Sequence, residues 1–513
     1  MDKNFYITTP IYYPSAKPHM GHAYSSIIAD FFARFKLIDD YSVHFLTGTD
    51  EHGLKIQRSA EKAGKNPQEF CDSISKTFRD LSKALNLSNT DFIRTTEERH
   101  KKTVQYLWNK LEKNDDIYLS NYSGWYSVSD EAFYTDDEIE EIDGEKIAVT
   151  SKSKVEWIEE ESYFFRLSKW EKPLLEFYES NPDFISPVSR KNEVISFVKS
   201  GLKDLSVSRR TFAWGIPVPS NKHHIIYVWL DALTNYLSAL NYPDTNDKLF
   251  KKFWPASIHL IGKDILRFHA VYWPAFLLAA NITLPKKIYG HGWILSGDEK
   301  MSKSKGNILD PLEIIKKYGL DSLRYYLIKE VSFGNDGNIS QDRLENCINS
   351  DLANNYGNLC QRVVAFTIKN CDGKIPSTIK LLDDDLKILN KYSNSLSKIR
   401  SKIDEQDINF YINYIVNSLF EANKYFNDQE PWKKKDDQVR LNTIVYTTLE
   451  IVRKISFLIY PIIPETSLKA LKIFNITEND IKLETISNNE YIKKGNTINK
   501  IEILIKKIEK NND

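Results

Sequence analysis

Two histidines near the N-terminus stand where a phosphate site would need them. Residues 5–8 form a short apolar run typical of a buried strand, and apolar side chains recur at helical spacing from residue 23 onward. His19, Gly21 and His22 lie between the two, on the first turn of the predicted helix. The free N–H groups and the positive dipole end of such a turn suit a polyphosphate, and Gly21 leaves room for a flat ring. By itself, the pattern is explained equally well by two surface histidines.

A second group of candidate phosphate ligands is the sequence Lys300-Met301-Ser302-Lys303-Ser304. Two lysines three residues apart on a polar loop could close over phosphates. They would stabilise the charge that develops at an α-phosphorus and on departing pyrophosphate. A loop of lysine and serine is ordinarily a solvated surface segment. Because the histidines precede it and long α/β segments lie between, we interpret the two motifs together as a site for adenylate chemistry.

The segments around these motifs alternate strand and helix patterns. This order predicts an α/β protein with a split Rossmann-like catalytic domain, whose parallel sheet is built from residues 1–115 and 221–290. The predicted strands are residues 5–8, 43–46, 225–229 and 258–261, and residues 288–294 precede the lysine loop. The predicted helices begin at residue 23 and cover residues 55–64, 67–85, 230–240 and 265–280.

Residues 116–220 differ in composition from the segments on either side and predict a small β-rich insertion. Residues 122–128 and 147–149 have strand composition, and the acidic, turn-forming residues 136–145 between them are typical of a solvated face. Residues 157–187 are predicted to be helical.

The second half of the chain becomes helical. Residues 291–345 are predicted to link the catalytic domain, through the lysine loop, to a helix bundle over residues 346–475. The tail, residues 476–513, is polar apart from one amphipathic piece, which we expect to pack back on the protein. That piece contains Ile498, Ile501, Ile505 and Ile508.

The totals place limits on the class of protein. The chain has 513 residues, 41% of them hydrophobic and 12% aromatic, so it is globular and long enough for about three domains. Its 70 basic and 70 acidic side chains give a formal net charge of zero, so a nucleic acid would be held by local patches. The four cysteines are scattered without a CxxC pair, which predicts reduced thiols in a cytoplasmic protein. Neither a membrane span nor a targeting peptide is expected.

Four stretches at predicted strand and helix ends form a candidate pocket. Asp50 offers a carboxylate suited to an α-ammonium group, and His269 offers a polar tip. An aromatic wall suits a thioether, because contacts between sulfur and aromatic rings are favourable, but it would also accept other apolar side chains. The remaining pocket candidates are Pro10, Ile11, Tyr13, Trp229, Ala232, Tyr236, Ile265 and Phe268.

These stretches carry a family resemblance over about residues 4–475. The histidine and lysine motifs resemble those of class I aminoacyl-tRNA synthetases. Residues 8–13 (TTPIYY), 47–53 (TGTDEHG), 227–232 (YVWLDA) and 262–265 (GKDI) are similar to the methionyl-tRNA synthetase family. In the helical part, residues 358–362 (NLCQR) and Pro431-Trp432 are similar to that family's anticodon-reading positions.

The resemblance implies a function. It implies ATP-dependent formation of methionyl-adenylate, followed by transfer of methionine to the 3′-terminal ribose of tRNA(Met), with Mg²⁺ on the phosphates. The implied catalytic residues are His19, His22, Lys300 and Lys303, with Gly21 and Ser302 also binding ATP. The implied anticodon contacts are hydrogen bonds from Asn358 and Arg362 and stacking by Trp432, which fits how proteins read single-stranded RNA. The alternative for Trp432 is a core residue at a helix end, but Pro431 before it and three lysines, residues 433–435, after it favour the RNA role. Without the resemblance, a solvent-facing position explains Asn358 and Arg362 nearly as well.

Departures from the family pattern lead to further expectations. The insertion of such enzymes often holds zinc through cysteines, whereas Ser127, Ser129 and Ala132 stand here with no cysteine, so a metal-free insertion is expected. No appended oligonucleotide-binding domain follows residue 475, so a monomer is expected.

The residues alone also leave other functions open. The nearest alternative is an aminoacyl-tRNA synthetase of the same class for cysteine or for another apolar amino acid, although residues 116–220 are too few to form a large editing insertion. A simple nucleotidyltransferase would not need the helical half. A non-catalytic RNA-binding relative would not need both phosphate motifs intact.

Overall fold

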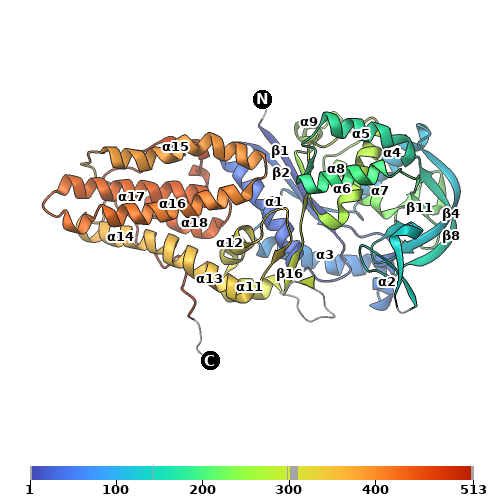
Figure 1. Cartoon of the computed structure of the whole chain (residues 1–513), viewed down its shortest axis with the longest axis horizontal. Helices are drawn as coiled ribbons and strands as arrows, with labels where there is room; N and C mark the ends of the chain where they lie inside the picture. The colour runs from blue at the N-terminus through green and yellow to red at the C-terminus, as the bar shows by residue number, and fades with distance from the viewer. Residues whose placement is uncertain (1–2, 143, 297–298, 301–309, 510–513) are drawn as a thin grey trace. The chain divides into compact units, whose positions relative to one another are not determined.

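The computed structural model describes residues 3–142, 144–296, 299–300 and 310–509. Contacts divide the chain into two compact units. The catalytic-sheet unit contains Asp2–Pro18 and Val43–His291, and the helical unit contains His19–Ser42 and Gly292–Asp513 together with Met1. Figure 1 traces the elements of both along the chain. The α/β architecture predicted from the sequence, with a helical second half, is confirmed.

A six-stranded sheet is the core of the catalytic-sheet unit, in the order β3-β2-β1-β14-β15-β9. β1 pairs in parallel with β14 through Ile7 and Ile258, and β14 pairs in parallel with β15. Strands from both halves of the sequence therefore share one sheet, as predicted. Its strands are β1 (Asn4–Tyr12), β2 (Ser42–Thr49), β3 (Asp91–Arg94), β9 (Ile185–Ser186), β14 (Ile258–Gly262) and β15 (Ile288–His291).

Helices of the same unit follow the strands. The predicted helices at 55–64, 67–85, 230–240 and 265–280 are all found, the last beginning with 3₁₀ and π turns. The helices are α2 (Leu54–Lys62), α3 (Pro67–Ala84), α4 (Glu98–Lys113), α5 (Glu171–Ser180), α6 (Val188–Lys199), α7 (Val228–Leu233), α8 (Asn235–Ser238), α9 (Lys248–Phe253) and α10 (Trp273–Ala279).

Residues 225–229 do not join the parallel sheet, so this part of the prediction is wrong. β13 (Asn221–Ile226) lies in a separate three-stranded sheet between β11 (Ser208–Arg209) and β12 (Pro217–Val218). Trp229 is already helical, in α7. A short apolar run shows that a segment is buried but not which neighbour it pairs with.

The insertion is built on a long antiparallel ribbon. β4 (Ile117–Ser127) pairs with β8 (Glu156–Phe165) along its whole length, from Ile117 opposite Phe165 to Tyr126 opposite Glu156. The helix predicted over 157–187 is therefore wrong for its first part, because cross-strand pairing with β4 decides the conformation of this acidic and aromatic segment. The ribbon continues into β5 (Ala132–Tyr134) and β10 (Leu205–Ser206), and a hairpin of β6 (Ile139–Ile142) and β7 (Glu145–Ala148) follows. β9, inside the predicted insertion range, pairs with β15 of the main sheet.

The helical unit combines α1 with the bundle. Arg324 and Arg34 both approach Asp30 Oδ2 at 2.7 Å, and Arg324 Nε also donates to the Ile462 carbonyl, so buried charges tie α1 to α12 and to the segment between α17 and α18. α17 packs against α14, α15, α16 and α18. The helices of this unit are α1 (Met20–Ile38), α11 (Pro311–Tyr318), α12 (Leu320–Glu330), α13 (Gln341–Cys347), α14 (Asn358–Asn370), α15 (Asp383–Asp404), α16 (Ile408–Asp428), α17 (Gln438–Ile459) and α18 (Pro464–Leu471).

The C-terminal tail packs back on the bundle, as predicted. The Ile498 N–H donates to the Gly373 carbonyl at 2.9 Å, and Asn349 exchanges two hydrogen bonds with the backbone of Ile508. Ile498 and Leu504 are buried. The segment is not helical and has no regular secondary structure over residues 501–509.

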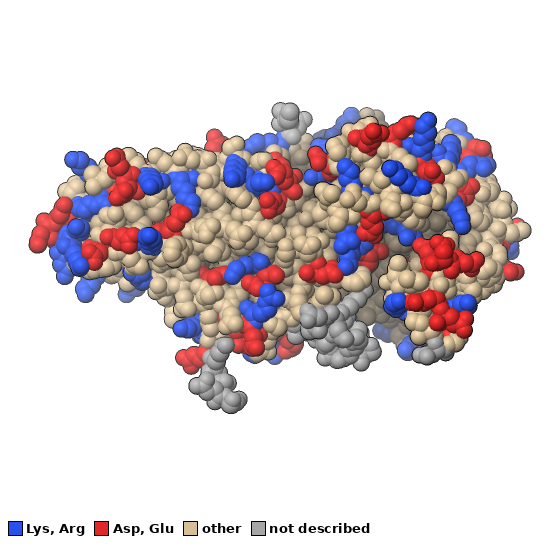
Figure 2. All heavy atoms as spheres, viewed as in Figure 1, with Lys and Arg blue, Asp and Glu red and all other residues tan. Residues whose placement is uncertain are grey.

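Two global properties were also predicted. Within the described ranges, none of the helices has the length and apolar character that crossing a bilayer would require. All four cysteines are described, and none is in a disulfide. Figure 2 shows Lys and Arg side chains interspersed with Asp and Glu over the face drawn, consistent with the zero formal net charge.

Candidate active site

Asp50 follows β2 directly and is held at the edge of the sheet. Its N–H donates to the Tyr12 carbonyl of β1 at 2.9 Å, and its side chain is buried. Asp50 Oδ1 has no hydrogen-bond partner among the described residues. Burial, with further contributions from nearby Asp231 and Glu131, raises the pKa of Asp50 well above its usual range. A buried acid in this state is well placed to receive a cation.

The adjacent acid has the opposite environment. Glu51 accepts hydrogen bonds from Arg94 Nε at 2.7 Å and Nη2 at 2.9 Å, and another from the Thr96 hydroxyl at 2.6 Å. The charge of Glu51 is therefore already paired within the protein. Of the two neighbouring carboxylates, Asp50 is the one left for a ligand.

Aromatic side chains predicted to form the pocket wall come together. The rings of Trp229 and Phe268 are stacked with centroids 3.7 Å apart, and Tyr13 meets Trp229 edge-on at 6.4 Å. The Tyr13 hydroxyl and Trp229 Nε1 are buried without a hydrogen-bond partner among the described residues, like Asp50 Oδ1. Unpartnered polar atoms in an otherwise apolar wall suit a ligand with an apolar side chain and a charged end.

His269 is a neutral, fixed hydrogen-bonding group. Its Nδ1 lies 3.0 Å from the Ile265 carbonyl and must donate there, so its Nε2 accepts from the Tyr236 hydroxyl at 2.8 Å. Burial lowers the pKa of His269 to about 4. The predicted polar tip is therefore engaged with Tyr236 and uncharged at neutral pH.

The other predicted pocket residues are also placed. Ile11 and Ile265 are partly buried against the core cluster that contains Trp229 and Tyr236. Ala232 is buried in α7, and Pro10 is half-buried in β1. These four residues add apolar surface without a polar contact from their side chains.

Sequence reasoning missed a buried network next to the pocket. Asp231 accepts hydrogen bonds from His52 Nδ1 and from His100 Nε2, both at 2.7 Å, and His100 Nδ1 meets the Ser238 hydroxyl at 2.8 Å. Although burial opposes this, the two histidines lower the pKa of Asp231 overall. Asp231 and His52 lie inside stretches already singled out, but His100 is a lone histidine in α4 and gives no sequence signal.

The histidine motif forms the N-terminus of α1, as predicted. The Gly21 N–H donates to His19 Nδ1 at 3.1 Å, and the His19 N–H donates to His22 Nδ1 at 3.0 Å. The neutral tautomers therefore carry their protons on Nε2, as donors suited to phosphate oxygens. A Cβ at Gly21 would lie 3.0 Å from His19 Cε1, so the space that glycine leaves is needed for the His19 ring itself.

Only the start of the lysine motif can be located. Lys300 lies in β17 (Glu299–Lys300), whose backbone pairs with Leu295 of β16 (Ile294–Ser296) in the helical unit. Ser302 and Lys303 lie outside the described residues.

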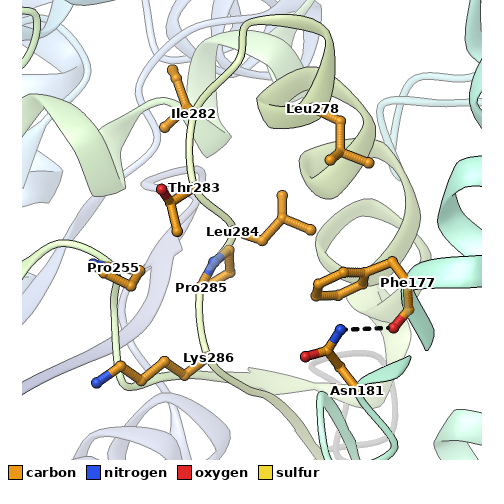
Figure 3. Close-up of a pocket in the computed structure, with 9 residues that line it drawn as sticks. All are labelled: Phe177, Asn181, Pro255, Leu278, Ile282, Thr283, Leu284, Pro285 and Lys286. Atoms are coloured by element: carbon orange, nitrogen blue, oxygen red, sulfur yellow. Dashed lines mark hydrogen bonds between the residues drawn. The ribbon is translucent and has the colours of Figure 1, made fainter. Parts of the chain in front are cut away.

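A shallow apolar hollow lies elsewhere in the catalytic-sheet unit (Figure 3). Phe177 and Leu284 form part of its wall, and Asn181 Nδ2 donates to the Phe177 carbonyl at 3.0 Å. Its lining includes one charged side chain, Lys286, and none of the predicted site residues. It does not contribute to the candidate active site.

Comparison with known proteins identifies the family. The model described as tRNA synthetases class I (M) matches residues 5–145 and 141–364, and that of the anticodon binding domain of methionyl tRNA ligase matches residues 375–513. The methionine–tRNA ligase of Brucella suis is 49% identical over 476 residues, covering 92% of each chain. That of Rickettsia conorii is 48% identical, covering 99% of this chain and 100% of the relative. The chain belongs to the methionyl-tRNA synthetase family.

Solved structures agree. The Mycobacterium tuberculosis methionyl-tRNA synthetase in complex with methionyl-adenylate is 44% identical, with a TM-score of 0.96, and the match covers 98% of this chain and 99% of that one. The apo form from the same organism has a TM-score of 0.89 at 40% identity, covering 99% of each chain. Family and fold predicted from the motifs are thus confirmed.

Two of the three anticodon candidates of this family member lie close together. Arg362 of α14 donates to Asn427 Oδ1 at 2.7 Å, and its guanidinium lies 5.5 Å from the Phe426 ring centroid. Trp432 meets the same ring edge-on at 6.2 Å and is 41% exposed, which argues against a core role. Asn358 is half-buried at the start of α14.

At the turn between β4 and β5, hydroxyl groups surround an acid. Asp130 accepts hydrogen bonds from Ser151 Oγ at 2.6 Å, from the Tyr134 hydroxyl at 2.8 Å and from Ser153, whose Oγ also accepts from Ser127 at 2.9 Å. Throughout the described ranges, no cluster of three His, Cys, Asp or Glu side chains suits a metal ion. The metal-free insertion stays a prediction.

Proposed function

We propose that this chain attaches methionine to tRNA(Met) in two steps. A carboxylate oxygen of methionine attacks the α-phosphorus of ATP, and the bond from that phosphorus to the bridging oxygen of pyrophosphate breaks. The 3′-terminal ribose hydroxyl of the tRNA then attacks the acyl carbonyl, and AMP leaves with the bonding electron pair. No nucleophilic side chain is required, so catalysis consists of positioning and electrostatic stabilisation.

The observation that carries the proposal is the buried carboxylate of Asp50, whose Oδ1 has no hydrogen-bond partner among the described residues, beside an aromatic wall. In the proposal, Asp50 binds the α-ammonium group, while Tyr13, Trp229 and Phe268 surround the thioether, for which contacts with aromatic rings are favourable. The stacking of Trp229 on Phe268 and the raised pKa of Asp50 support these roles. Similarity to a structure that holds methionyl-adenylate supports the same substrate.

The phosphate-binding roles rest on the helix terminus and on the family. His19 and His22 would donate from Nε2 to ATP phosphate oxygens, and Lys300 and Lys303 would stabilise the charge on the leaving pyrophosphate. Mg²⁺ would enter with the ATP phosphates. Because the described residues offer no acidic cluster that would hold a resident ion, no step is assigned to a protein-bound metal.

The oligomeric state and the cellular location are also part of the proposal. We infer that the protein is a monomer, which light scattering would test. We also infer a cytoplasmic enzyme, because the four free thiols fit a reducing compartment.

The deciding experiment is amino-acid-dependent ATP–pyrophosphate exchange, run without tRNA over all twenty amino acids. Exchange with methionine alone is expected. Exchange driven by another amino acid would keep the fold and overturn the substrate, and a folded protein that binds RNA without any exchange would instead be a non-catalytic relative.

A further inference from the structure

A buried acid of the insertion reaches into the catalytic sheet. Glu131 stands at the turn between β4 and β5 with a φ of 50°, and its side chain is fully buried. Its carboxylate accepts hydrogen bonds from the Tyr126 hydroxyl and, at 2.7 Å, from the Lys55 N–H. Its carbonyl accepts from the Tyr227 hydroxyl at 2.8 Å. The insertion is thereby joined to two segments next to the candidate pocket.

The Lys55 contact acts as a helix cap. Lys55 is the second residue of α2, and Gly53, which precedes that helix, makes no side-chain cap of its own. The first N–H groups of a helix need an outside acceptor, and a negative charge is favoured there. Glu131, from another part of the chain, supplies both.

The same turn touches the loop that carries Asp50. Gly53 has a φ of 102°, and a Cβ there would lie 2.8 Å from Glu131 Oε1. Lys55 Nζ donates to the Ser129 carbonyl at 2.8 Å and lies 4.8 Å from the centroid of the Tyr13 ring. Residues 50–55 therefore lie against the β4–β5 turn at Gly53 and at both ends of Lys55.

We propose that Glu131 is a positioning residue for methionine binding, because its carboxylate caps α2 and so fixes the loop that presents Asp50 to the α-ammonium group. The inference rests on the proposed function. In this inference the insertion helps to build the amino-acid pocket. Glu131 contributes through the length of its side chain, which brings the carboxylate to the Lys55 N–H, and not through its charge alone.

Two substitutions separate the effect of side-chain length at residue 131 from the effect of its charge. Glu131→Asp keeps the charge but is one methylene too short to cap Lys55, and Glu131→Gln keeps the length and an acceptor oxygen but loses the charge. We expect E131D to weaken methionine binding by about 10- to 100-fold, the range for an unsatisfied buried donor. E131Q should stay within about threefold of the unchanged protein. Both would be measured by calorimetry with methionine alone.

A matched control and a kinetic readout accompany these variants. Glu141 lies in the same insertion, is exposed, and pairs only with Lys146 at 3.3 Å among the described side chains, so Glu141→Ala should change nothing. In ATP–pyrophosphate exchange, E131D should raise the KM for methionine and leave the KM for ATP within about threefold. If E131D changed both KM values, or if E131Q bound methionine as weakly as E131D, the length of the Glu131 side chain would not be what positions the loop, and the inference would be wrong.

A double-mutant cycle tests whether Glu131 acts through Asp50. In an Asp50→Asn background the ammonium contact is already lost, so adding E131D should cost less than about threefold in methionine affinity. If the two losses multiply instead, Glu131 acts independently of Asp50 and the inference is wrong. Failure of the unchanged protein to exchange with methionine would refute the proposed function, whereas normal exchange with an unaffected E131D would refute only this inference.

Discussion

At the level of single residues, the distribution of acids around the pocket decides which of them is available. Glu51 is paired with Arg94, and Asp231 accepts hydrogen bonds from His52 and His100, whereas Asp50 Oδ1 is buried without a partner among the described residues. Because the pKa of Asp50 is raised, its ionised form is disfavoured until a cation arrives. The cation that methionine brings is its ammonium group.

This arrangement predicts a pH dependence of methionine binding. Only ionised Asp50 pairs with an ammonium, so affinity should fall as pH falls through its raised pKa, by up to about tenfold per pH unit below that value. Calorimetry between pH 8 and pH 5 measures it. His269, with a pKa of about 4, stays neutral over this range.

The matched variant is Asp50→Asn. It should bind methionine about 30- to 1,000-fold more weakly at pH 8, the cost of removing one partner of a buried charge pair. Its affinity should also lose the pH dependence. Parallel pH profiles for the two proteins would mean that another group titrates.

At the level of elements, the β4–β5 turn is stabilised by hydrogen bonds that converge on one acid. Although burial opposes it, hydrogen bonds from Ser151, Ser153 and Tyr134 lower the pKa of Asp130 overall. Since Glu131 is the next residue, the order of this turn also determines where the α2 cap lies.

We therefore expect Asp130→Ala to loosen the insertion locally. Loss of the shared acceptor removes one hydrogen bond each from Ser151, Ser153 and Tyr134, at a cost of about 0.5–1.5 kcal/mol per bond, because these hydroxyls are not fully buried and keep contacts with one another. Amide hydrogen exchange should speed up across residues 127–134 and 151–153, while the helical unit keeps its protection. Glu145→Ala, on the exposed neighbouring hairpin, is the control. Equal loss of protection throughout the chain would mean that Asp130 supports global rather than local stability.

Local pattern was enough to predict some elements and not others. β1 and α1 were predictable because an apolar run and a helical repeat are properties of adjacent residues. β8 was mistaken for helix and β13 was assigned to the wrong sheet, because their conformation and place are set by pairing with β4 and with β11 and β12. The sequence of one strand does not reveal which distant strand it pairs with.

The candidate site shows the same division. Asp50 and the aromatic wall were predictable because their residue types and motifs indicate the chemistry. His100 and Glu131 were not, because each acts from an element distant in sequence, through a hydrogen bond that exists only in the folded chain. Candidate ligand-binding residues could therefore be predicted, whereas the residues that hydrogen-bond to their neighbouring segments were missed.

At the level of the whole molecule, the two units carry different parts of the proposed reaction. The catalytic-sheet unit holds the candidate amino-acid pocket. The helical unit holds the histidines at the start of α1, the backbone of Lys300 and the three anticodon candidates. Buried charges around Asp30 tie α1 to the bundle within that unit. Because the histidines and the anticodon candidates lie on different elements of the helical unit, adenylation and anticodon reading should be separable by mutation.

Trp432 is the residue at which to test that separation. It is 41% exposed and meets the Phe426 ring, which the Arg362 guanidinium also contacts, an arrangement suited to stacking on an unpaired base. Trp432→Ala should lower kcat/KM for charging tRNA(Met) by about 10- to 100-fold, since a stacked base contributes about 1–3 kcal/mol. ATP–pyrophosphate exchange, which needs no tRNA, should be unchanged.

The control for Trp432→Ala is another aromatic residue on the same bundle. Phe420 of α16 is 66% exposed, so Phe420→Ala removes a similar ring without the neighbouring arginine and should leave both reactions unchanged. If Trp432→Ala lowers exchange as well as charging, the tryptophan supports the fold of the helical unit rather than reading RNA. If it lowers neither, base stacking at this position is wrong, and anticodon recognition would depend on Asn358 and Arg362.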